Sequence, residues 1–410
     1  MARCGGEVPP TAGLPLVLGD FAPSGKSLEQ DLATFLQQPS VQVECSGTAA
    51  LIVALITLKR LSSRRSVIVP AYTCPLVARA VTASGLTPVL CDTRAGSFDL
   101  SPEILTRACG PNTLAVIVTH LGGRVADLAT AAAIAKAAGA YVIEDAAQSM
   151  GATWQGRPVG GLGDVGFYSL GVGKGLTIYA GGVLLARGED LRQEMRETSD
   201  RVARFRLGWE LRRFAELAGY GLLYHPNGLR LAYGAALRRH LRAGRLIEAV
   251  GDDCPPDIPL HRVGAWRKVI GANALKRLPH FLSAGNARAA QRKVRLQAIG
   301  GVMVMDDAEG NVGVWPFFQV LMPTQAARDA ALERLWRQGL GVGRLFIHAL
   351  PDYPDLLTMP SSTSVDNARD YAARMLEITN SEWLDDDRFE RVCSVIENVV
   401  IQNKVRSVTL

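Results

Sequence analysis

The stretch YVIEDAAQSMGATWQGRPVGGLGDVGFYSLGVGKGLT, residues 141–177, carries the features that decide the fold. It contains two short runs, YVIED and VGFYSL, that are rich in β-branched and aromatic residues and mostly apolar. Strands of this kind are buried on both faces, as in parallel sheets covered by helices. Asp145 closes the first run, and Lys174 lies among glycines just after the second. The stretch therefore predicts two buried strands with a candidate site beyond their carboxyl ends.

The same alternation of strand-like and helix-like segments extends from about residue 41 to 186. The expected strands are VQVEC, SVIVP, TPVLCD, LAVIVTH, AYVIEDA, VGFYSL and GGVLLA. Between them lie helix-like stretches such as GTAALIVALITLKRL, CPLVARAVTASG, SPEILTRACG and LATAAAIAKAAGA. This alternation predicts an α/β fold with a doubly wound and mainly parallel sheet.

The remainder of the chain has a different pattern. Residues 187 to about 260 are helical in character, with interruptions at YHPNGL and DDCPPDIP. After them we expect a helix over 286–299, a strand over 313–322, a helix opened by Thr324, a strand over 341–347 and two C-terminal helices. We therefore predict an N-terminal arm (1–24), a large α/β domain (25–260) with an Arg-rich helical insert at about 200–250, and a smaller α+β domain (261–410).

Composition narrows the class of protein. The 410 residues are 48% hydrophobic and 20% charged, with a net charge of +6, as expected of a soluble globular chain. No apolar run has the length of a membrane span, and the first residues do not resemble a signal peptide. The seven cysteines are scattered without a CxxC pair, and the six histidines are dispersed, which favours a cytoplasmic protein with no metal centre.

Arginines interleave with leucine, alanine, tryptophan and tyrosine between residues 200 and 245. This segment is compatible with an amphipathic surface that contacts a membrane or an anionic substrate. The alternative, which we favour, is a set of helices that covers the core or forms a subunit interface. No nucleic-acid-binding motif accompanies the charge, so we expect no nucleic-acid partner.

Lys174 has three interpretations: a nucleotide-binding loop, a covalent cofactor anchor or a solvated turn. A Walker A loop requires GxxxxGK[ST], but Tyr168 occupies the first glycine position and Gly175 follows the lysine. The favoured alternative is a lysine that forms a Schiff base with pyridoxal phosphate. That site also needs a carboxylate for the pyridine nitrogen and donors for the phosphate.

Candidates for both partners are present. Asp145 is the candidate carboxylate. Ser46, Gly47 and Thr48 open an apolar helix whose N-terminal N–H groups suit a phosphate, and Ser169 adds a hydroxyl. Each residue alone is equally compatible with a helix cap or a turn. Their joint occurrence favours the cofactor site.

These segments resemble the DegT/DnrJ/EryC1/StrS aminotransferases, which are sugar aminotransferases of fold type I that depend on pyridoxal phosphate. The resemblance rests on SGTAAL, VPAYTCPLVARAV, GLTPVLCD, HLGGRVADL and the run from Val142 to Lys174, and it is strong over about residues 40–190. It implies that Lys174 anchors the cofactor and moves protons, that Asp145 pairs with the ring nitrogen, and that Gln148 lies beside the ring. The same resemblance assigns the phosphate to Gly47, Thr48 and Ser169.

The family's reaction moves an amino group from a donor, typically glutamate, to a keto-sugar that is usually linked to a nucleotide. The products enter polysaccharide, glycolipid or antibiotic pathways. The resemblance also implies a homodimer with small-molecule substrates. Two alternatives remain open: a dehydratase or deoxygenase with the same cofactor, whose family relatives often replace the lysine by histidine, and a non-catalytic sensory or scaffold protein.

The sequence departs from the family pattern in three places. Cys74 replaces the aromatic residue that stacks on the ring, so Tyr72 is a candidate substitute. Tyr179 and Ala180 stand where the family has an acidic residue before GG. The partner-reaching GxNxR segment is not recognisable, with Asn227 or Asn273 as candidate replacements.

Two histidines are candidate substrate contacts. His120 ends an expected strand near the site, and His348 lies where the family's small domain approaches it. Each is equally compatible with a histidine that is hydrogen-bonded inside the protein. The central expectation is that the amine of Lys174 and the carboxylate of Asp145 face one common cavity.

Overall fold

A seven-stranded sheet forms the centre of the protein. The computed structural model describes residues 6–255, 257–356 and 364–408. The strand order is β1-β9-β8-β5-β4-β2-β3, and only the β8–β9 and β9–β1 pairs are antiparallel. The strands are β1 (Gln42–Glu44), β2 (Ser66–Pro70), β3 (Thr87–Cys91), β4 (Thr113–Thr119), β5 (Tyr141–Asp145), β8 (Val165–Ser169) and β9 (Gly182–Ala186). All seven expected strands and the mainly parallel sheet are confirmed.

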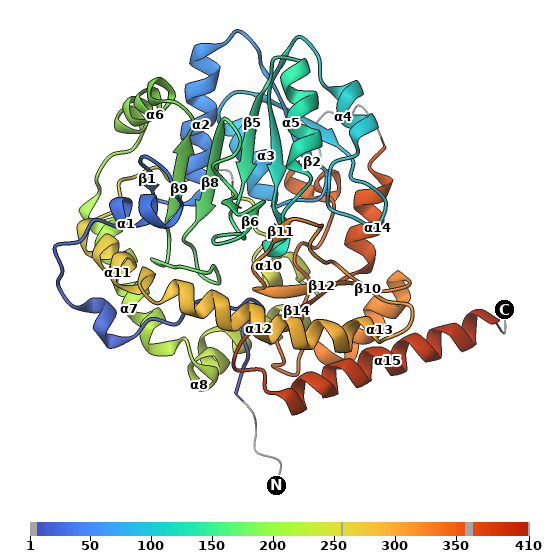
Figure 1. Ribbon diagram of the computed structural model, residues 1–410. Coiled ribbons are helices and arrows are strands. Elements are labelled where there is room, and N and C mark those ends of the chain that lie inside the picture. The colour runs from blue at the N-terminus through green and yellow to red at the C-terminus, as the bar shows by residue number, and fades with distance from the viewer. Residues whose placement is uncertain (1–5, 256, 357–363, 409–410) are drawn as a thin grey trace.

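Helices between these strands cover the sheet (Figure 1). They are α2 (Gly47–Leu61), α3 (Pro75–Ala83), α4 (Pro102–Ala108), α5 (Leu128–Ala137) and α6 (Glu189–Val202). Helix α2 is apolar on almost every face because it packs against β8 and β9 and also against α3 and α6. Its first turn therefore lies at the carboxyl edge of β8.

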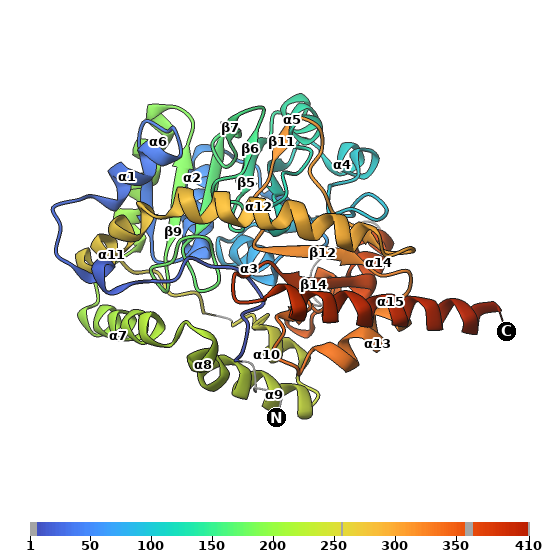
Figure 2. The same ribbon diagram turned by 60° about the horizontal axis from the view of Figure 1, so that its bottom comes forward.

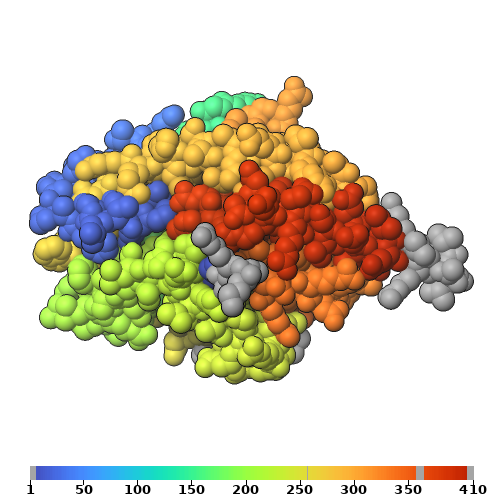
Figure 3. Space-filling model, turned by 90° about the horizontal axis from the view of Figure 1, so that it is seen from below, coloured from blue at the N-terminus to red at the C-terminus, as the bar shows by residue number. Residues whose placement is uncertain are grey.

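The Arg-rich segment is helical, as the sequence predicts. It comprises α7 (Leu207–Leu223), α8 (Pro226–Leu229), a π-helical turn (Arg230–Gly234), α9 (Ala235–Arg242) and α10 (Leu246–Val250). These helices lie together on one side of the molecule, below the sheet in the view of Figure 2. In Figure 3 the same segment forms a continuous surface next to the N-terminal residues and the C-terminal helix.

The C-terminal part contains a second sheet with the order β10-β12-β14-β13, in which every pair is antiparallel. Its strands are β10 (Met303–Val304), β12 (Phe317–Leu321), β13 (Val342–Gly343) and β14 (Met375–Thr379). Its helices are α11 (Ala265–Leu275), α12 (Leu278–Gln297), α13 (Gln325–Leu335), α14 (Asp366–Arg374) and α15 (Asp386–Val408). Thr324 caps α13, as expected, because its hydroxyl accepts a hydrogen bond from the N–H of Ala327 at 3.1 Å.

Two expectations for this region are corrected. The strand expected over 341–347 is limited to Val342–Gly343. Beyond it, the N–H of Ile347 donates to the carboxylate of Asp252 and to the hydroxyl of Tyr353 instead of to a neighbouring strand. Strand β14 was not expected, because its run MLEIT is short and directly follows a helical pattern.

Contacts between distant segments join the two sheets. Strand β11 (Asn311–Val312) pairs with β6 (Thr153–Trp154), which in turn pairs with β7 (Arg157–Pro158) in the connection between β5 and β8. The N-terminal segment also contacts both the C-terminal part and the loop that carries Lys174. Ala12 N–H donates to the carbonyl of Pro316, and Leu14 N–H donates to the carbonyl of Gly175.

The division into an arm, a large and a small domain stays a prediction. Helix α11, which the sequence places just after the boundary at residue 260, packs against α1 (Leu28–Phe35) and the 3-10 turn at Leu18–Phe21.

Candidate functional site

The carboxyl ends of β4, β5 and β8 meet at one edge of the large sheet. Thr119, Asp145 and Phe167 are neighbours across these strands, and Ser169 ends β8. A cavity of about 290 Å³ lies at this edge. Its walls include Ser46, Gly47, Thr48, Cys74, His120, Asp145, Gln148, Ser169, Lys174 and Phe346. The tertiary structure thus brings the expected lysine, carboxylate and hydroxyl-bearing residues together.

One end of this cavity is formed by the start of helix α2. The hydroxyl of Ser46 caps the helix by accepting a hydrogen bond from the N–H of Ala49 at 2.9 Å. The first N–H groups of a helix have no intrahelical acceptor, so this end of the cavity is rich in donors. A Cβ added at Gly47 would lie 3.2 Å from the Cβ of Ser169, so the glycine permits the close approach of α2 to β8.

Lys174 lies in the glycine-rich loop after β8. Its backbone N–H donates to the carbonyl of Gly171 at 3.3 Å, and the following residue accepts a hydrogen bond from Leu14 of the N-terminal segment. Burial lowers the pKa of the Lys174 amine, while the nearby charges of Asp145 and Glu377 oppose that shift. The environment therefore increases the fraction of neutral amine, which is the form that acts as a nucleophile or base.

Asp145 is almost completely buried at the end of β5. Its Oδ1 accepts a hydrogen bond from the N–H of Ala147 at 3.1 Å. Burial raises the pKa of this carboxyl, and that hydrogen bond and the charge of Lys174 counteract the shift. A cationic or N–H-bearing ligand in the cavity would favour the carboxylate form.

Gln148 lines the same cavity, and its orientation is fixed by the loop after β4. Its Oε1 accepts a hydrogen bond from the N–H of Gly122 at 2.7 Å. Gly122 has φ 62°, a left-handed conformation that suits glycine. The amide NH₂ group of Gln148 is therefore available as a donor toward a bound group.

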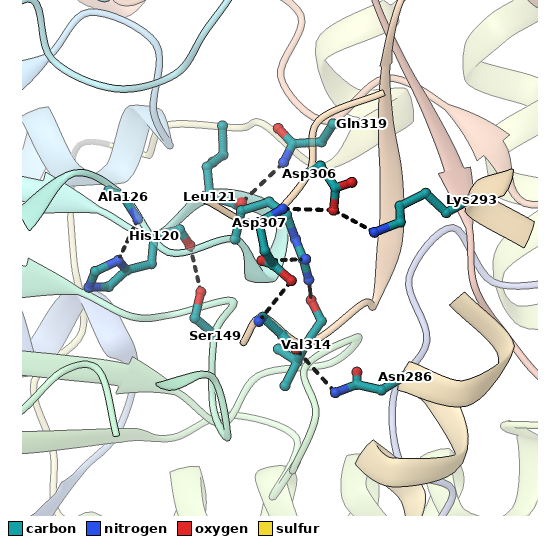
Figure 4. A network of polar contacts seen from close by, with 12 residues as sticks. His120, Leu121, Ala126, Ser149, Asn286, Lys293, Asp306, Asp307, Val314 and Gln319 are labelled. Carbon is teal, nitrogen blue, oxygen red and sulfur yellow. Dashed lines mark hydrogen bonds and ion pairs between the residues drawn. The ribbon is translucent and has the colours of Figure 1, made fainter. Parts of the chain in front are cut away.

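His120 lines the cavity, but its ring nitrogens bind the protein. Nδ1 accepts from the N–H of Ala126 at 3.1 Å, so Nε2 carries the hydrogen that is donated to Glu144 at 3.1 Å. Glu144 also accepts from the N–H of Gly160 at 2.7 Å. The hydroxyl of Ser149 donates to the carbonyl of His120 (Figure 4). A substrate contact by His120 stays a prediction, and only its ring surface is available for one.

The loop that follows His120 is bound through Arg124 to the segment between β10 and β12. Its guanidinium donates to Asp307 at 2.6 Å and to the carbonyl of Val314, and it lies 3.3 Å from the ring centroid of Trp315. Figure 4 shows Asp307, Asp306 and Val314 gathered at this junction, with Gln319 donating to the carbonyl of Leu121. This network positions the loop that carries His120 and Gly122.

Of the residues near the expected stacking position, Cys74 and Phe346 line the cavity, whereas Tyr72 is not among its lining residues. Tyr72 is fully buried and packs against the rings of Phe346 and Tyr371, with centroid distances of 5.6 Å and 5.0 Å. Cys74 lines the cavity, and burial raises the pKa of its thiol to about 12, so it is a neutral wall residue. Phe346 also lines the cavity and is an aromatic residue that the sequence did not single out.

The remaining candidates lie outside the residues that line this cavity. The ring of His348 packs edge-on against Tyr353 at 5.4 Å. The amide of Asn273 donates to the carbonyls of Asp20 and Ala22, and Asn227 lies in α8. Their proposed roles stay predictions. Tyr179 has φ 70°, which is unusual for a bulky residue, and it lines the larger cavity described next.

A second cavity of about 760 Å³ adjoins the first, and Cys74, Gln148, Lys174 and Phe346 line both. Its other walls come from the N-terminal segment, from helices α7 to α10 and from β13 and β14. Sequence reasoning missed its buried acidic residues, Glu7, Asp252 and Glu377. The signal for Glu377 was a single carboxylate within the apolar run MLEIT.

Comparisons with known proteins agree with this geometry. The sequence model of the DegT/DnrJ/EryC1/StrS aminotransferase family matches residues 19–210 and 264–397. GDP-perosamine synthase of Caulobacter vibrioides is 36% identical over 151 residues, which are 37% of this chain and 40% of that protein. The chain spans less than half the length of the first curated relatives that it matches.

Two solved structures show the same fold. The sugar aminotransferase CalS13 of Micromonospora echinospora has a TM-score of 0.72 and 21% identity, over 95% of this chain and all of that one. The protein Spr1654 of Streptococcus pneumoniae, solved in a PLP form, has a TM-score of 0.74 and 16% identity, over 97% and 99% of the two chains. The expected fold, that of the fold type I enzymes, is confirmed.

Proposed function

The chain belongs to the DegT/DnrJ/EryC1/StrS aminotransferase family, and from this premise we propose that it is a pyridoxal-phosphate-dependent aminotransferase acting on a keto-sugar or a sugar-like ketone. The observation that carries the proposal is that Lys174 and Asp145 line one cavity with the start of helix α2. A lysine, a carboxylate and a phosphate-binding helix end are the parts that this cofactor requires.

The residues present fit the cofactor. The N–H groups at Gly47 and Thr48 and the hydroxyl of Ser169 would hold the phosphate at the donor-rich end of the cavity. The absence of a side chain at Gly47 leaves room for that group. Asp145 would bind the ring nitrogen, and the NH₂ group of Gln148 would donate to the ring's phenolic oxygen.

When bound, pyridoxal phosphate supplies an aldehyde carbon to which amines attach and a ring that takes up the electrons released at the α-carbon. Lys174 would hold the cofactor until a substrate amine replaces it. The displaced amine of Lys174 would then carry a proton between the donor's α-carbon and the cofactor's aldehyde carbon. Burial lowers the pKa of Lys174, so the neutral amine needed for this step is more populated than in water.

Asp145 would keep a proton on the ring nitrogen. Because Asp145 is buried among apolar strands, its interaction with a cationic nitrogen is screened little by water. The proposed donor is an amino acid, with glutamate as the first candidate, and the proposed acceptor is a keto-sugar in polysaccharide or secondary-metabolite biosynthesis. The name of the Caulobacter relative, GDP-perosamine synthase, supports the sugar class.

A homodimer is part of the proposal. Leucines 207, 211 and 222 are exposed along one side of α7, and Leu231 is exposed in the π-helical turn. An apolar surface of this kind favours a protein interface over contact with water. Light scattering after size exclusion should give twice the chain mass, and a monomer at micromolar concentration would contradict the proposal.

We also propose a cytoplasmic location, which the scattered cysteines without a CxxC pair support. In the described part of the chain, no helix combines the length and apolar character that crossing a membrane requires.

The decisive experiment uses the cofactor's colour and a chemical label. Purified protein with pyridoxal phosphate should absorb visible light, and borohydride followed by peptide mass spectrometry should place the cofactor on Lys174. Glutamate added before borohydride should bleach the visible band. Lys174→Ala should lose both the label and turnover, whereas Lys136→Ala, a change at an exposed lysine, should retain both.

Three outcomes would contradict the proposal. Wild-type protein without colour would favour a non-catalytic role. A label on another lysine would reject the assignment of Lys174. Colour that neither glutamate nor other amino donors bleach would favour a different reaction of the same cofactor, such as dehydration.

A further inference from the structure

The larger cavity opens from the lysine toward the helical segment and the second sheet. It shares Lys174 and Gln148 with the cofactor cavity, so a molecule within it would reach the reacting atoms. Most of its other walls are apolar or aromatic, including Tyr179, Tyr220, Tyr224, Tyr233, Leu229 and Leu237. The cavity is therefore the space in which the amino acceptor of the proposed reaction would bind.

Carboxylates outnumber cationic groups in these walls. The acidic residues are Glu7, Glu216, Asp252 and Glu377, and among the described residues that line the cavity only Lys174 and Arg344 are cationic. Lys174 is committed to the cofactor in the proposed function. Arg344 donates to the carbonyls of Ile347 and Ala372. A ligand in this cavity therefore meets more acidic than basic side chains.

Three of the four carboxylates already have strong partners. Glu7 forms an ion pair with Arg238 at 2.6 Å, and Glu216 pairs with Arg213 at 2.7 Å. Asp252 accepts a hydrogen bond from the hydroxyl of Tyr353 at 2.6 Å. Each of these groups is satisfied without a ligand.

Glu377 differs from the other three. Its side chain is 3% exposed, and its Oε1 has no hydrogen-bond partner among the described residues. In β14 it lies opposite Gly343, which has no side chain, and opposite Gln319. The amide of Gln319 is already hydrogen-bonded elsewhere. Its oxygen accepts from the hydroxyl of Tyr371, and its nitrogen donates to the carbonyl of Leu121. A buried carboxyl without a partner is costly, so its presence beside the reaction centre points to a ligand group that binds it.

We propose that the acceptor ketone carries a second, protonated amino group that binds Glu377, and that it carries no phosphate. This inference rests on the proposed function and specifies the acceptor of that reaction. An ammonium group would complete the hydrogen bonding of Glu377 and would face the electron-rich rings of the cavity tyrosines. A nucleoside diphosphate would instead bring two negative charges into a largely apolar space whose described walls offer no cation besides Lys174 and Arg344.

The test uses the reverse half-reaction, in which an amine bleaches the coloured, cofactor-loaded enzyme. The probes are 2-deoxystreptamine, a cyclitol with two amino groups, and scyllo-inosamine, a cyclitol with one. The third probe is a UDP-linked 4-amino-4,6-dideoxyhexose. In wild-type enzyme, the second-order rate constant for bleaching should be at least about tenfold higher for the diamine than for the other two, as expected of a charge-assisted hydrogen bond.

Glu377→Gln keeps the shape and removes the acidic group that would pair with an ammonium ion. This variant should reduce the preference for the diamine to within about threefold of the monoamine, whereas Glu333→Gln, a change at an exposed glutamate of α13, should leave the preference intact. Faster bleaching by the UDP-linked sugar in the wild type, or a diamine preference that survives in Glu377→Gln, would overturn the inference.

Bleaching of the wild type by glutamate separates the two proposals. If glutamate bleaches the enzyme and the diamine shows no advantage, the inference fails and the aminotransferase proposal stands. If neither glutamate nor any amine bleaches coloured enzyme, the aminotransferase proposal itself fails. The wild-type comparison requires no variant, so it remains decisive even if Glu377→Gln folds poorly.

Discussion

Ser46 and Gly47 show how single residues shape the cofactor end of the site. Ser46 ends the chain's extended segment and caps α2, and Gly47 allows the first turn of that helix to approach the end of β8. Neither residue is chemically reactive. Their contribution is to direct backbone N–H groups into the cavity at short range.

Gly47→Ala should therefore weaken cofactor binding without unfolding the protein. The new Cβ would lie 3.2 Å from the Cβ of Ser169 and would occupy space beside the proposed phosphate position. We expect the dissociation constant for pyridoxal phosphate to rise by about tenfold or more, which corresponds to about 1.4 kcal/mol. Fluorescence titration of the apoprotein measures it, and Gly208→Ala, at a position with no neighbour within 4 Å, is the control. Unchanged affinity would show that the phosphate does not bind there.

Glu377 should also make stability depend on pH. Burial raises the pKa of this carboxyl from 4.5 to about 8, with the charge of Lys174 opposing the shift. Between these values the folded state holds a proton that the unfolded state has lost, so stability falls as pH rises through this window. The slope attributable to Glu377 should approach about 1.4 kcal/mol per pH unit.

Urea denaturation of the cofactor-free protein at several pH values between 5 and 9 tests this prediction. The difference in unfolding free energy between Glu377→Gln and the wild type should grow with pH up to about 8 and level off above it. Subtraction of the two curves cancels the titration of other groups. A difference that is flat across the window would mean that Glu377 titrates near its ordinary pKa.

At the scale of elements, helix α7 is bound to the loop that follows the lysine. Arg267 of α11 is completely buried and forms an ion pair with Glu210 of α7. The same guanidinium donates to the carbonyls of Ile178 and Ala180. The guanidinium of Arg267 therefore binds both α7, which lines the larger cavity, and the loop that carries Tyr179.

Arg267→Met should destabilise the protein by about 3–5 kcal/mol, because it leaves the buried carboxylate of Glu210 without its partner. Urea denaturation measures the change. The control is Arg262→Met, which removes an exposed ion pair with Asp200 and should cost no more than about 1 kcal/mol. Equal effects of the two changes would argue that burial does not strengthen the Arg267 contact.

At the scale of the whole molecule, Arg124 connects the loop after β4 of the large sheet with the segment between β10 and β12 of the second sheet. It extends from the loop after β4 to Asp307 and Trp315, and a Cβ at Gly313 would collide with its guanidinium. This junction lies beside the loop that orients Gln148 and His120. The position of the second sheet and the shape of the cofactor cavity are therefore coupled through Arg124.

Arg124→Met should lower the unfolding free energy by about 3–5 kcal/mol and increase amide hydrogen exchange in residues 120–126 and 306–316. Exchange in β2 and β3 should change much less, because the hydrogen bonds of Arg124 go to Asp307 and Val314 and not to these strands. The matched control is Arg196→Met, at an exposed ion pair with Glu189. Faster exchange confined to only one of the two segments would contradict a shared role in joining them.

Local sequence patterns determined the large sheet and the reactive pair. Continuous apolar strands and helix-capping residues are properties of neighbouring residues, so VGFYSL, AYVIEDA and SGTAAL predicted their elements and the carboxyl edge at which Asp145, Ser169 and Lys174 meet. Strand β14 escaped prediction because its short apolar run has no signal of its own and forms only by pairing with β12 and β13.

The tertiary structure alone decided what surrounds that pair. It bound both nitrogens of His120 inside the protein, placed Phe346 on the cavity wall and brought Glu377 from a chain segment some 200 residues away to the vicinity of Lys174. Contacts of this kind depend on how separate elements pack, and neither periodicity nor spacing along the chain encodes them. The sequence thus determined the fold and the candidate chemistry, whereas packing determined the shape and charge of the space in which a substrate would bind.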